Sequence, residues 1–153
     1  MSEKYVRINI GSTTYDNFIS EEIDMKLFNK VNVNPLKKKV GDCSIRAIST
    51  ATGKDWDIVF MDLCEIAFDL KCMPNGDEAT EQYLKANNFV RIPIKVTKGS
   101  KRPTVESFTK EHAQGTYVLR VANHMVAVKE GMYHDTWDSG TCCVYSYWVK
   151  QDK

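Results

Sequence analysis

The amino-acid sequence predicts an α+β fold, with helices first and antiparallel strands last. Apolar residues recur with a helical period between residues 43 and 86, and from residue 90 onward they alternate with polar residues as in strands. A run of helices followed by a run of strands is typical of α+β proteins, so we expect the helices to pack against one side of a sheet. The length of 153 residues suits one core, and we treat residues 1–153 as a single domain.

The N-terminal part of the chain has the weakest signals. The run YVRINI, residues 5–10, alternates and predicts a short strand that ends at GSTT. Residues 16–34 show weak helical signals, and NVNPLKKKVGD, residues 32–42, is typical of a loop. We therefore treat residues 1–34 as an N-terminal extension or arm of the domain.

Three helices are predicted in the middle of the chain. The first begins after Asp42, a good N-cap residue, and ends at Gly53. The second covers residues 56–70 and is broken by CMPNGD, and the third covers residues 77–86. The second helix has the most regular pattern, which predicts a core-facing apolar stripe of Trp56, Val59, Phe60, Leu63, Ala67 and Leu70.

Strands dominate the rest of the chain. The run VRIPIKV alternates, and Pro93 predicts an edge strand or a bulge there. A short helix is predicted over PTVESFTKEH, with Thr104 as its cap. The later strand-like runs are TYVLRV, HMVAV, MYHDTW and CCVYSYWV, which start at residues 116, 124, 132 and 142.

The composition and the net charge limit the classes of partner and ligand that we expect for this protein. The net charge of +1 gives no basis for nucleic acid or a membrane surface as the main partner. No apolar run approaches the roughly 20 residues of a membrane span, and the opening residues lack the pattern of a secretion signal. Five cysteines, an odd number, favour free thiols in a reducing compartment, so we expect a cytoplasmic protein without a cofactor. A zinc site of Cys142, Cys143 and His134 is disfavoured, because adjacent strand residues point to opposite faces.

Cys43 is the first candidate for chemistry, because it lies between a turn-forming Gly-Asp pair and the first predicted helix. The thiolate is the nucleophilic form of cysteine, and it is favoured at a helix N-terminus and beside cationic groups. A nucleophilic cysteine also needs an imidazole close in space. Of the three histidines, His124 is the best placed, since it opens a strand and so projects over the edge of the sheet. A buried structural thiol and an ordinary strand histidine are the alternative interpretations.

The carboxylate that would orient this histidine depends on the next turn. A third side chain usually accepts the other ring N–H of a catalytic histidine. If residues 130–131 form a two-residue loop, strand pairing puts Asp135 on the face of His124 as a diagonal neighbour. A loop of odd length would instead bring His134 and Asp138 onto that face. We favour the two-residue loop and Asp135.

The order of these residues resembles the papain-like cysteine peptidases, in which a cysteine at a helix start is followed by a histidine on one strand and an Asn or Asp on the next. Asp42-Cys43 resembles the Asp-Cys of the compact bacteriocin-processing branch, and Asp135-Thr136-Trp137 resembles the Asn-Ser-Trp that closes the papain triad. The resemblance covers residues 34–147 and extends to small members from phages and bacteria. It implies a papain-like fold, with N-terminal helices packed on a C-terminal antiparallel sheet, and a shielding role for Trp137.

The sequence departs from the family pattern in two places. The separation of Cys43 and His124 is shorter than the roughly 130–150 positions of papain and closer to the compact members. Family members often have a Gln six residues before the cysteine to help hold the oxyanion, where this chain has Lys37. We expect the backbone N–H of Cys43 to be one oxyanion donor, and the side-chain amide of Asn34 or Asn32 to be the other.

Together these features predict a cysteine-dependent acyl hydrolase. Cys43 would be the nucleophile, His124 the general base and later acid, and Asp135 the orienting carboxylate, acting through a thioester on a protein or peptide substrate. Amidases, isopeptidases, transglutaminases and acyltransferases use the same set of groups, and peptide-bond hydrolysis is favoured among these reactions. The alternative is a non-catalytic binding module, for instance a phage or bacterial protein that captures a partner without turnover.

Overall fold

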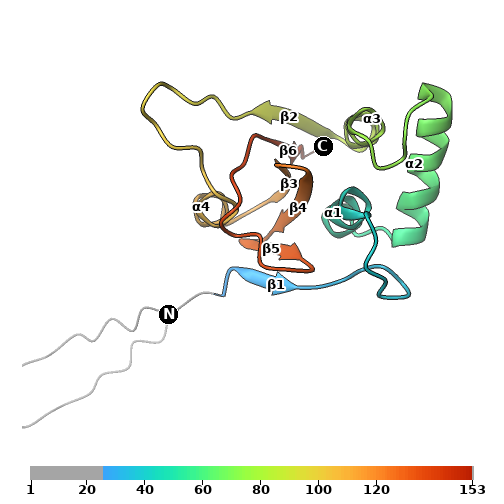
Figure 1. Ribbon diagram of the computed structural model, residues 1–153, viewed down its shortest axis with the longest axis horizontal. Coiled ribbons are helices and arrows are strands. Elements are labelled where there is room, and N and C mark those ends of the chain that lie inside the picture. The colour runs from blue at the N-terminus through green and yellow to red at the C-terminus, as the bar shows by residue number, and fades with distance from the viewer. Residues whose placement is uncertain (1–25, 153) are drawn as a thin grey trace, which may run out of the picture.

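The computed structural model describes residues 26–152, and Figure 1 shows them as one sheet with helices on both of its faces. The strand predicted at residues 5–10 lies outside the described residues, as does the first part of the segment 16–34. Four α-helices and a six-stranded mixed sheet make up the described part of the chain, which confirms the α+β class. None of these helices is long and apolar enough to cross a membrane.

The helices begin and end close to where the sequence predicts. The first three are α1 (Cys43–Thr52), α2 (Trp56–Leu70) and α3 (Asp77–Ala86). Gly53 ends α1 because it adopts a left-handed conformation with φ 73°, and its N–H donates to the carbonyl of Ser49. The fourth helix, α4 (Val105–Glu111), starts at its predicted cap, where Thr104 accepts a hydrogen bond from the N–H of Ser107.

The six strands lie in the order β1-β5-β4-β3-β6-β2. Neighbours are antiparallel except β1, which runs parallel to β5. The edge position of β2 agrees with the prediction from Pro93. Two predictions are wrong, because β1 is a strand where weak helical signals were expected, and β6 starts four residues after the predicted run does. The bounds are β1 (Phe28–Lys30), β2 (Phe89–Pro93), β3 (Thr116–Val121), β4 (His124–Lys129), β5 (Met132–Asp135) and β6 (Ser146–Lys150).

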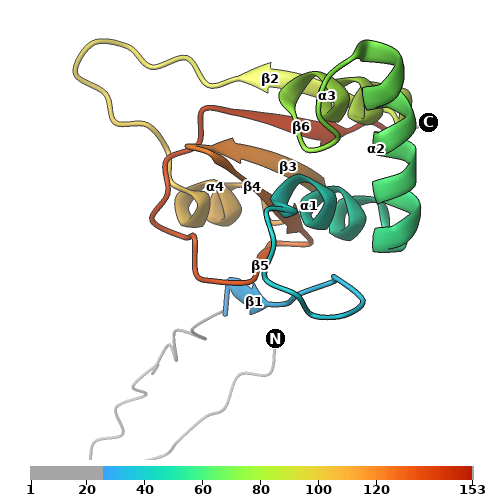
Figure 2. The same cartoon turned by 45° about the vertical axis from the view of Figure 1, so that its right-hand side comes forward.

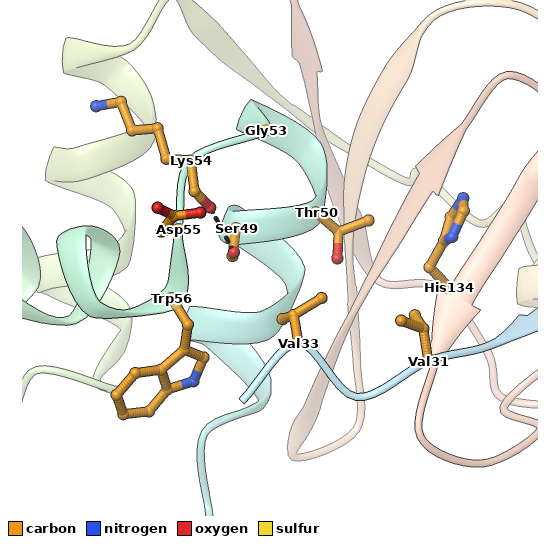
Figure 3. Close-up of a pocket in the computed structure, with 9 residues that line it drawn as sticks. All are labelled: Val31, Val33, Ser49, Thr50, Gly53, Lys54, Asp55, Trp56 and His134. Atoms are coloured by element: carbon orange, nitrogen blue, oxygen red, sulfur yellow. Dashed lines mark hydrogen bonds between the residues drawn. The ribbon is translucent and has the colours of Figure 1, made fainter. Parts of the chain in front are cut away.

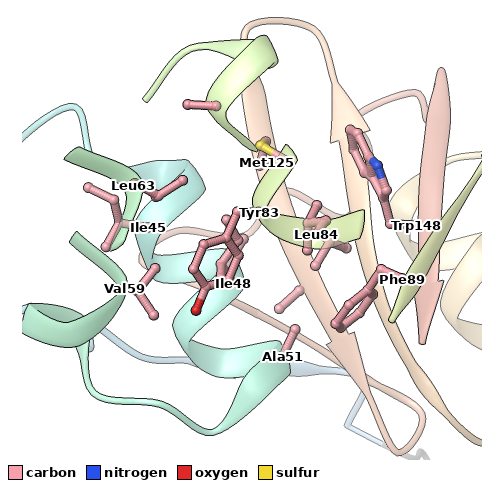
Figure 4. Packing of buried hydrophobic residues seen from close by; sticks show 14 of the residues in the cluster. Ile45, Ile48, Ala51, Val59, Leu63, Tyr83, Leu84, Phe89, Met125 and Trp148 are labelled. Atoms are coloured by element: carbon pink, nitrogen blue, oxygen red, sulfur yellow. The ribbon is translucent and has the colours of Figure 1, made fainter. Parts of the chain in front are cut away.

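The sheet separates two hydrophobic clusters. In the first, shown in Figure 4, Ile48 of α1 and Leu84 of α3 pack with Trp148 of the sheet. Because successive strand residues point to opposite faces, β3 and β4 contribute to both clusters. The expectation that all helices cover one side is therefore wrong, since α4 covers the face opposite α1 (Figure 2). The second cluster consists of Val105, Phe108, Leu119, Val121, Val126, Val128, Tyr133 and Val144.

The predicted core stripe of α2 is only partly buried. Val59, Leu63 and Ala67 are buried as expected. Phe60 and Leu70 are 36% and 43% exposed, although the periodicity placed them in the core. Figure 1 shows the reason, since α2 is the outermost helix and packs mainly against α1 and α3. A single line of side chains therefore faces inward.

Candidate active site

A tight hairpin sets the geometry of the site. The loop Glu130-Gly131 that joins β4 to β5 has φ angles of 50° and 72°. Positive φ at both central positions is what a type I′ turn requires. The two-residue loop and the strand register predicted from it are confirmed, and the register puts Asp135 on the same side of the hairpin as His124. The pairs are Lys129 with Met132, Val128 with Tyr133 and Ala127 with His134.

His124 and Asp135 are in direct contact. The ring Nε2 lies 2.6 Å from the carboxylate Oδ2. Two further donors hold this buried carboxylate: the hydroxyl of Ser139 donates to Oδ2 at 2.7 Å, and the N–H of Thr136 donates to Oδ1 at 2.7 Å. A carboxylate held on both oxygens fixes the orientation of the imidazole. Ser139 is a site residue that the sequence does not reveal, since a loop serine carries no distinguishing pattern.

The thiol of Cys43 meets the other side of the same imidazole. Because Nε2 is bonded to Asp135, Nδ1 is the nitrogen left for the hydrogen bond between the ring and the sulfur. The backbone N–H of Met125 also lies close enough to the sulfur to lower the pKa of the thiol. Cys43 is the first residue of α1 and is partly exposed, so an incoming group can reach it. The helix start and the first residue of β4 therefore meet at a thiol–imidazole pair.

The surroundings favour the charged forms of both groups. Burial raises the pKa of the Cys43 thiol, but the hydrogen bonds from His124 and the Met125 N–H, with the positive charges of His124 and Arg46, bring the pKa below its ordinary value. Burial lowers the pKa of His124, but its hydrogen bonds to Asp135 and Cys43 raise the pKa to about 9. The α1 N-terminus adds a positive field at the sulfur. These surroundings therefore favour the thiolate–imidazolium form of the pair more than water would favour it for a free cysteine and a free histidine.

Asp42 does not cap α1 with its side chain, contrary to the prediction. The buried carboxylate instead accepts from the indole N–H of Trp56 at 2.9 Å and from the amide of Asn34 at 3.3 Å. It also forms an ion pair with Arg46, one turn further along α1. A charged donor makes a stronger hydrogen bond than a neutral backbone N–H, which explains why the carboxylate turns away from the helix end.

Arg46 is a second residue that the sequence does not reveal. A charged residue in an amphipathic helix is normally expected on the solvent face. Its side chain is instead only 12% exposed, and its Nη2 lies 4.0 Å from Oδ1 of Asp135. Arg46 therefore lies between Asp42 and the carboxylate that holds the imidazole.

The two asparagines expected near the oxyanion organise the loop before Cys43. Asn34 accepts from the N–H of Leu36 at 3.0 Å, while its amide donates to Asp42. Asn32 donates to the carbonyl of Lys38 at 3.2 Å and accepts from the N–H of Asn34. Of the two, Asn34 is the buried one, and its partner Asp42 is the residue next to Cys43. The N–H of Cys43 itself belongs to the first turn of α1, where backbone donors have no partner within the helix.

Trp137 lies against the imidazole. The centroids of the Trp137 and His124 rings are 5.2 Å apart, with an angle of 35° between the ring planes. The indole is 47% exposed, so one face contacts the histidine and much of the rest meets solvent. This placement agrees with the shielding role that the family resemblance implies.

The alternative pair of His134 and Asp138 is not part of this site. Asp138 accepts from the hydroxyl of Tyr133 at 2.6 Å and from the N–H of Gly140 at 3.0 Å. The ring Nδ1 of His134 lies 2.9 Å from the amide nitrogen of Asn29 on β1. The two-residue loop is the reason, since only an odd loop would have turned these side chains toward His124.

A hollow of about 290 Å³ lies beside α1 (Figure 3). Residues of the segment after β1, the end of α1, Trp56 and His134 line it, and neither Cys43 nor His124 is among them. Its one link to the site is Trp56, whose indole N–H donates to Asp42. The hollow supplies no group to the thiol–imidazole pair.

Metal-ligating side chains are not gathered anywhere in residues 26–152: no group of three His, Cys, Asp or Glu residues there could hold an ion. Cys142 is partly buried and Cys143 is exposed. The disfavoured zinc site of these cysteines with His134 has no support in this part of the chain.

Comparisons with protein-family models, with curated proteins and with solved structures each found no match. The chemistry of the site follows from its own groups. A partly exposed thiol, an imidazole and a buried carboxylate form one continuous chain of contacts. Such a chain can generate a nucleophile and can carry a proton to and from a leaving group.

The pKa shifts of His124 and Cys43 affect the free energy of unfolding in opposite directions. His124 titrates at 6.5 in its ordinary state and at about 9 in the folded protein, so its stabilisation is complete below pH 6.5 and is lost as the pH rises through 9. The lowered pKa of Cys43 stabilises the fold above its ordinary value of 9.0, and this contribution is lost as the pH falls through the folded value. Between the folded-state pKa of Cys43 and pH 9 the two trends oppose each other, because the folded chain gives up the Cys43 proton while it keeps the His124 proton.

We therefore expect the free energy of unfolding of Cys43→Ser to fall more steeply than that of the wild type as the pH rises above 6.5. Only the imidazole titrates in this variant, and Asp135 still raises its pKa. Urea unfolding at a series of pH values measures the profiles of Cys43→Ser and of the wild type. The reference is the double variant Cys43→Ser/His124→Gln, which lacks both the thiol and the imidazole. A flat profile for Cys43→Ser would mean that Asp135 does not hold the proton on His124.

Proposed function

We propose that this protein is a cysteine-dependent acyl hydrolase that cleaves peptide bonds. One observation carries the proposal: the imidazole of His124 lies between the thiol of Cys43 and the buried carboxylate of Asp135. A structural cysteine does not need a hydrogen-bonded imidazole. An ordinary strand histidine does not need a carboxylate that is itself held by three donors.

In the proposed mechanism the thiolate of Cys43 attacks the carbonyl carbon of the substrate, and the carbonyl oxygen becomes an oxyanion. The N–H groups at the start of α1 are the nearest fixed donors for this charge. The imidazolium of His124 then gives its proton to the leaving amine as the C–N bond breaks, which leaves a thioester on Cys43. Neutral His124 next takes a proton from water, hydroxide attacks the thioester, and the acid product departs with the thiolate restored.

Asp135 and Trp137 support these steps without touching the reacting atoms. Asp135 accepts from Nε2, so the proton that moves during the reaction is the one on Nδ1. It also stabilises the imidazolium that exists before attack. The indole of Trp137 covers the ring and limits the access of water to the His124–Asp135 hydrogen bond.

We further propose that the fold is papain-like. The support is the order of the elements: a cysteine starts the first of three helices, and a histidine and an aspartate follow on two neighbouring strands of one sheet. Against a strict likeness, β1 joins the sheet as a parallel strand and α4 covers its second face. We place the protein in a reducing compartment such as the cytoplasm, since its five cysteines are all free.

The test is to look for acyl transfer at Cys43. The protein is incubated with p-nitrophenyl acetate and, separately, with a mixture of unstructured peptides, and the products are identified by mass spectrometry. We expect an acetyl group on Cys43 during ester turnover, and peptide cleavage that Cys43→Ala abolishes. Acylation with transfer to an added amine but without hydrolysis would instead identify an acyltransferase. If Cys43 is never acylated, the protein is a binding module and the proposal is wrong.

A further inference from the structure

Arg46 carries a buried positive charge against this site, and the mechanism above does not use it. Its side chain is 12% exposed, and its guanidinium contacts two carboxylates whose side chains are 3% and 2% exposed, those of Asp42 and Asp135. A buried carboxylate is costly unless its charge is balanced. Asp135 has His124 as a partner, whereas the other donors to Asp42, Trp56 and Asn34, are neutral.

These contacts form a closed ring of polar groups that includes the thiol. From Cys43 the ring passes to His124 on β4, to Asp135 on β5, and through Arg46 back to α1. Arg46 is therefore a second polar link between the helix that carries the nucleophile and the hairpin that carries the base. Asp42 fixes the guanidinium at the helix end of this link, and is itself held by the indole of Trp56.

The charges of the ring explain why an acidic residue can sit directly before the nucleophile. In the active state Cys43 and Asp135 are negative and His124 is positive, so Asp42 would add a further negative charge beside the thiolate. A like charge nearby disfavours the thiolate. Arg46 cancels the charge of Asp42 and also acts directly on the sulfur as a positive charge.

We propose that Arg46 is a positioning residue, which neutralises Asp42 beside the nucleophile and places its positive charge 4.0 Å from Oδ1 of Asp135 while Oδ2 holds the imidazole. The proposal deepens the proposed function and rests on it. It predicts that the charge of Arg46 matters chiefly because Asp42 is charged. Removing the charges of both residues should therefore raise the pKa of Cys43 less than removing the charge of Arg46 alone.

The experiment measures the apparent pKa of Cys43 from its rate of alkylation by iodoacetamide at a series of pH values, with the modified cysteine identified by mass spectrometry. We expect Arg46→Gln to raise this pKa by about one unit. The double variant Asp42→Asn/Arg46→Gln should return most of the way to the wild-type value, and Arg46→Lys should lie between. Arg91→Gln is the matched control, because Arg91 pairs with Glu81 away from the site and should leave the pKa unchanged.

The possible outcomes distinguish the role of Arg46 from the proposed function of the protein. If wild-type Cys43 has a low pKa and Arg46→Gln leaves it there, Arg46 has no part in the site and the proposed function still stands. If the double variant is no better than Arg46→Gln, the arginine acts through packing and the charge-balancing role is wrong. If wild-type Cys43 has an ordinary pKa, the proposed function fails and the role of Arg46 fails with it. Should Arg46→Gln not fold, the comparison of Arg46→Lys with the double variant makes the same test.

Discussion

Replacing Cys43 with serine is expected to lower acyl turnover by at least about a thousandfold while the protein stays folded. The imidazole of His124 can hold a thiolate as an ion pair, but a serine hydroxyl loses its proton far less readily. The substitution changes one atom at a partly exposed position, so the hydrogen bonds of His124 to Asp135 should survive it. Turnover of an activated ester measures the loss, and thermal unfolding measures the fold.

Cys143→Ser is the matched control for this prediction. Cys143 is exposed, so the same change of sulfur to oxygen there should leave turnover within about twofold of the wild type. Equal activity in Cys43→Ser and the wild type would show that the nucleophile is another residue.

Replacing Asp135 with alanine should have the largest combined effect on activity and stability. The substitution leaves the hydroxyl of Ser139 and the N–H of Thr136 without their acceptor, and it removes the partner of the His124 imidazolium. We expect the free energy of unfolding to fall by about 2–4 kcal/mol. Turnover should fall by about a hundredfold or more, because the imidazole loses both its orientation and the partner that raises its pKa to about 9.

Asp135→Asn separates the hydrogen bond from the charge. Its carbonyl oxygen can still accept from Nε2 of His124, but its NH2 group cannot accept from the N–H of Thr136, so only part of the stability should return. The pKa of His124 should fall below about 9. Asp138→Ala is the control, since Asp138 is exposed in the same loop and bonds to Tyr133. Urea unfolding, ester turnover and an NMR titration of His124 measure the three effects. If Asp138→Ala lost more turnover than Asp135→Ala, Asp138 and not Asp135 would be the carboxylate that orients His124.

Local signals explain the parts of the fold that the sequence predicts well. Gly53 ends α1 through its own left-handed conformation, and Glu130-Gly131 fixes the hairpin through a turn of two residues. Both features depend on neighbouring residues only. The hairpin register carried that local information to the candidate site, because it determined which aspartate faces His124.

Long-range contacts explain the parts that the sequence does not predict. The three residues of β1 have no strand pattern of their own and pair with β5, more than a hundred positions away. Nothing in the short helix α4 indicates which face of the sheet it covers. The sequence indicates that Arg46 is a solvent-facing helix residue. Its guanidinium lies near Asp135 only because α1 packs on the hairpin. Asp42 likewise reads as a cap because its buried partners Trp56 and Asn34 come from other segments.

The most direct test of the account is the pH dependence of Cys43 alkylation by iodoacetamide, in the wild type and in His124→Ala, followed by mass spectrometry against the other four cysteines. We expect Cys43 to react selectively, with an apparent pKa well below its ordinary value of 9.0, and we expect His124→Ala to lose that selectivity. Such a result would establish the thiolate–imidazolium pair on which the proposed function depends. If Cys43 reacts no faster than the other cysteines at any pH, the thiolate–imidazolium pair does not form and the protein is better explained as a binding module.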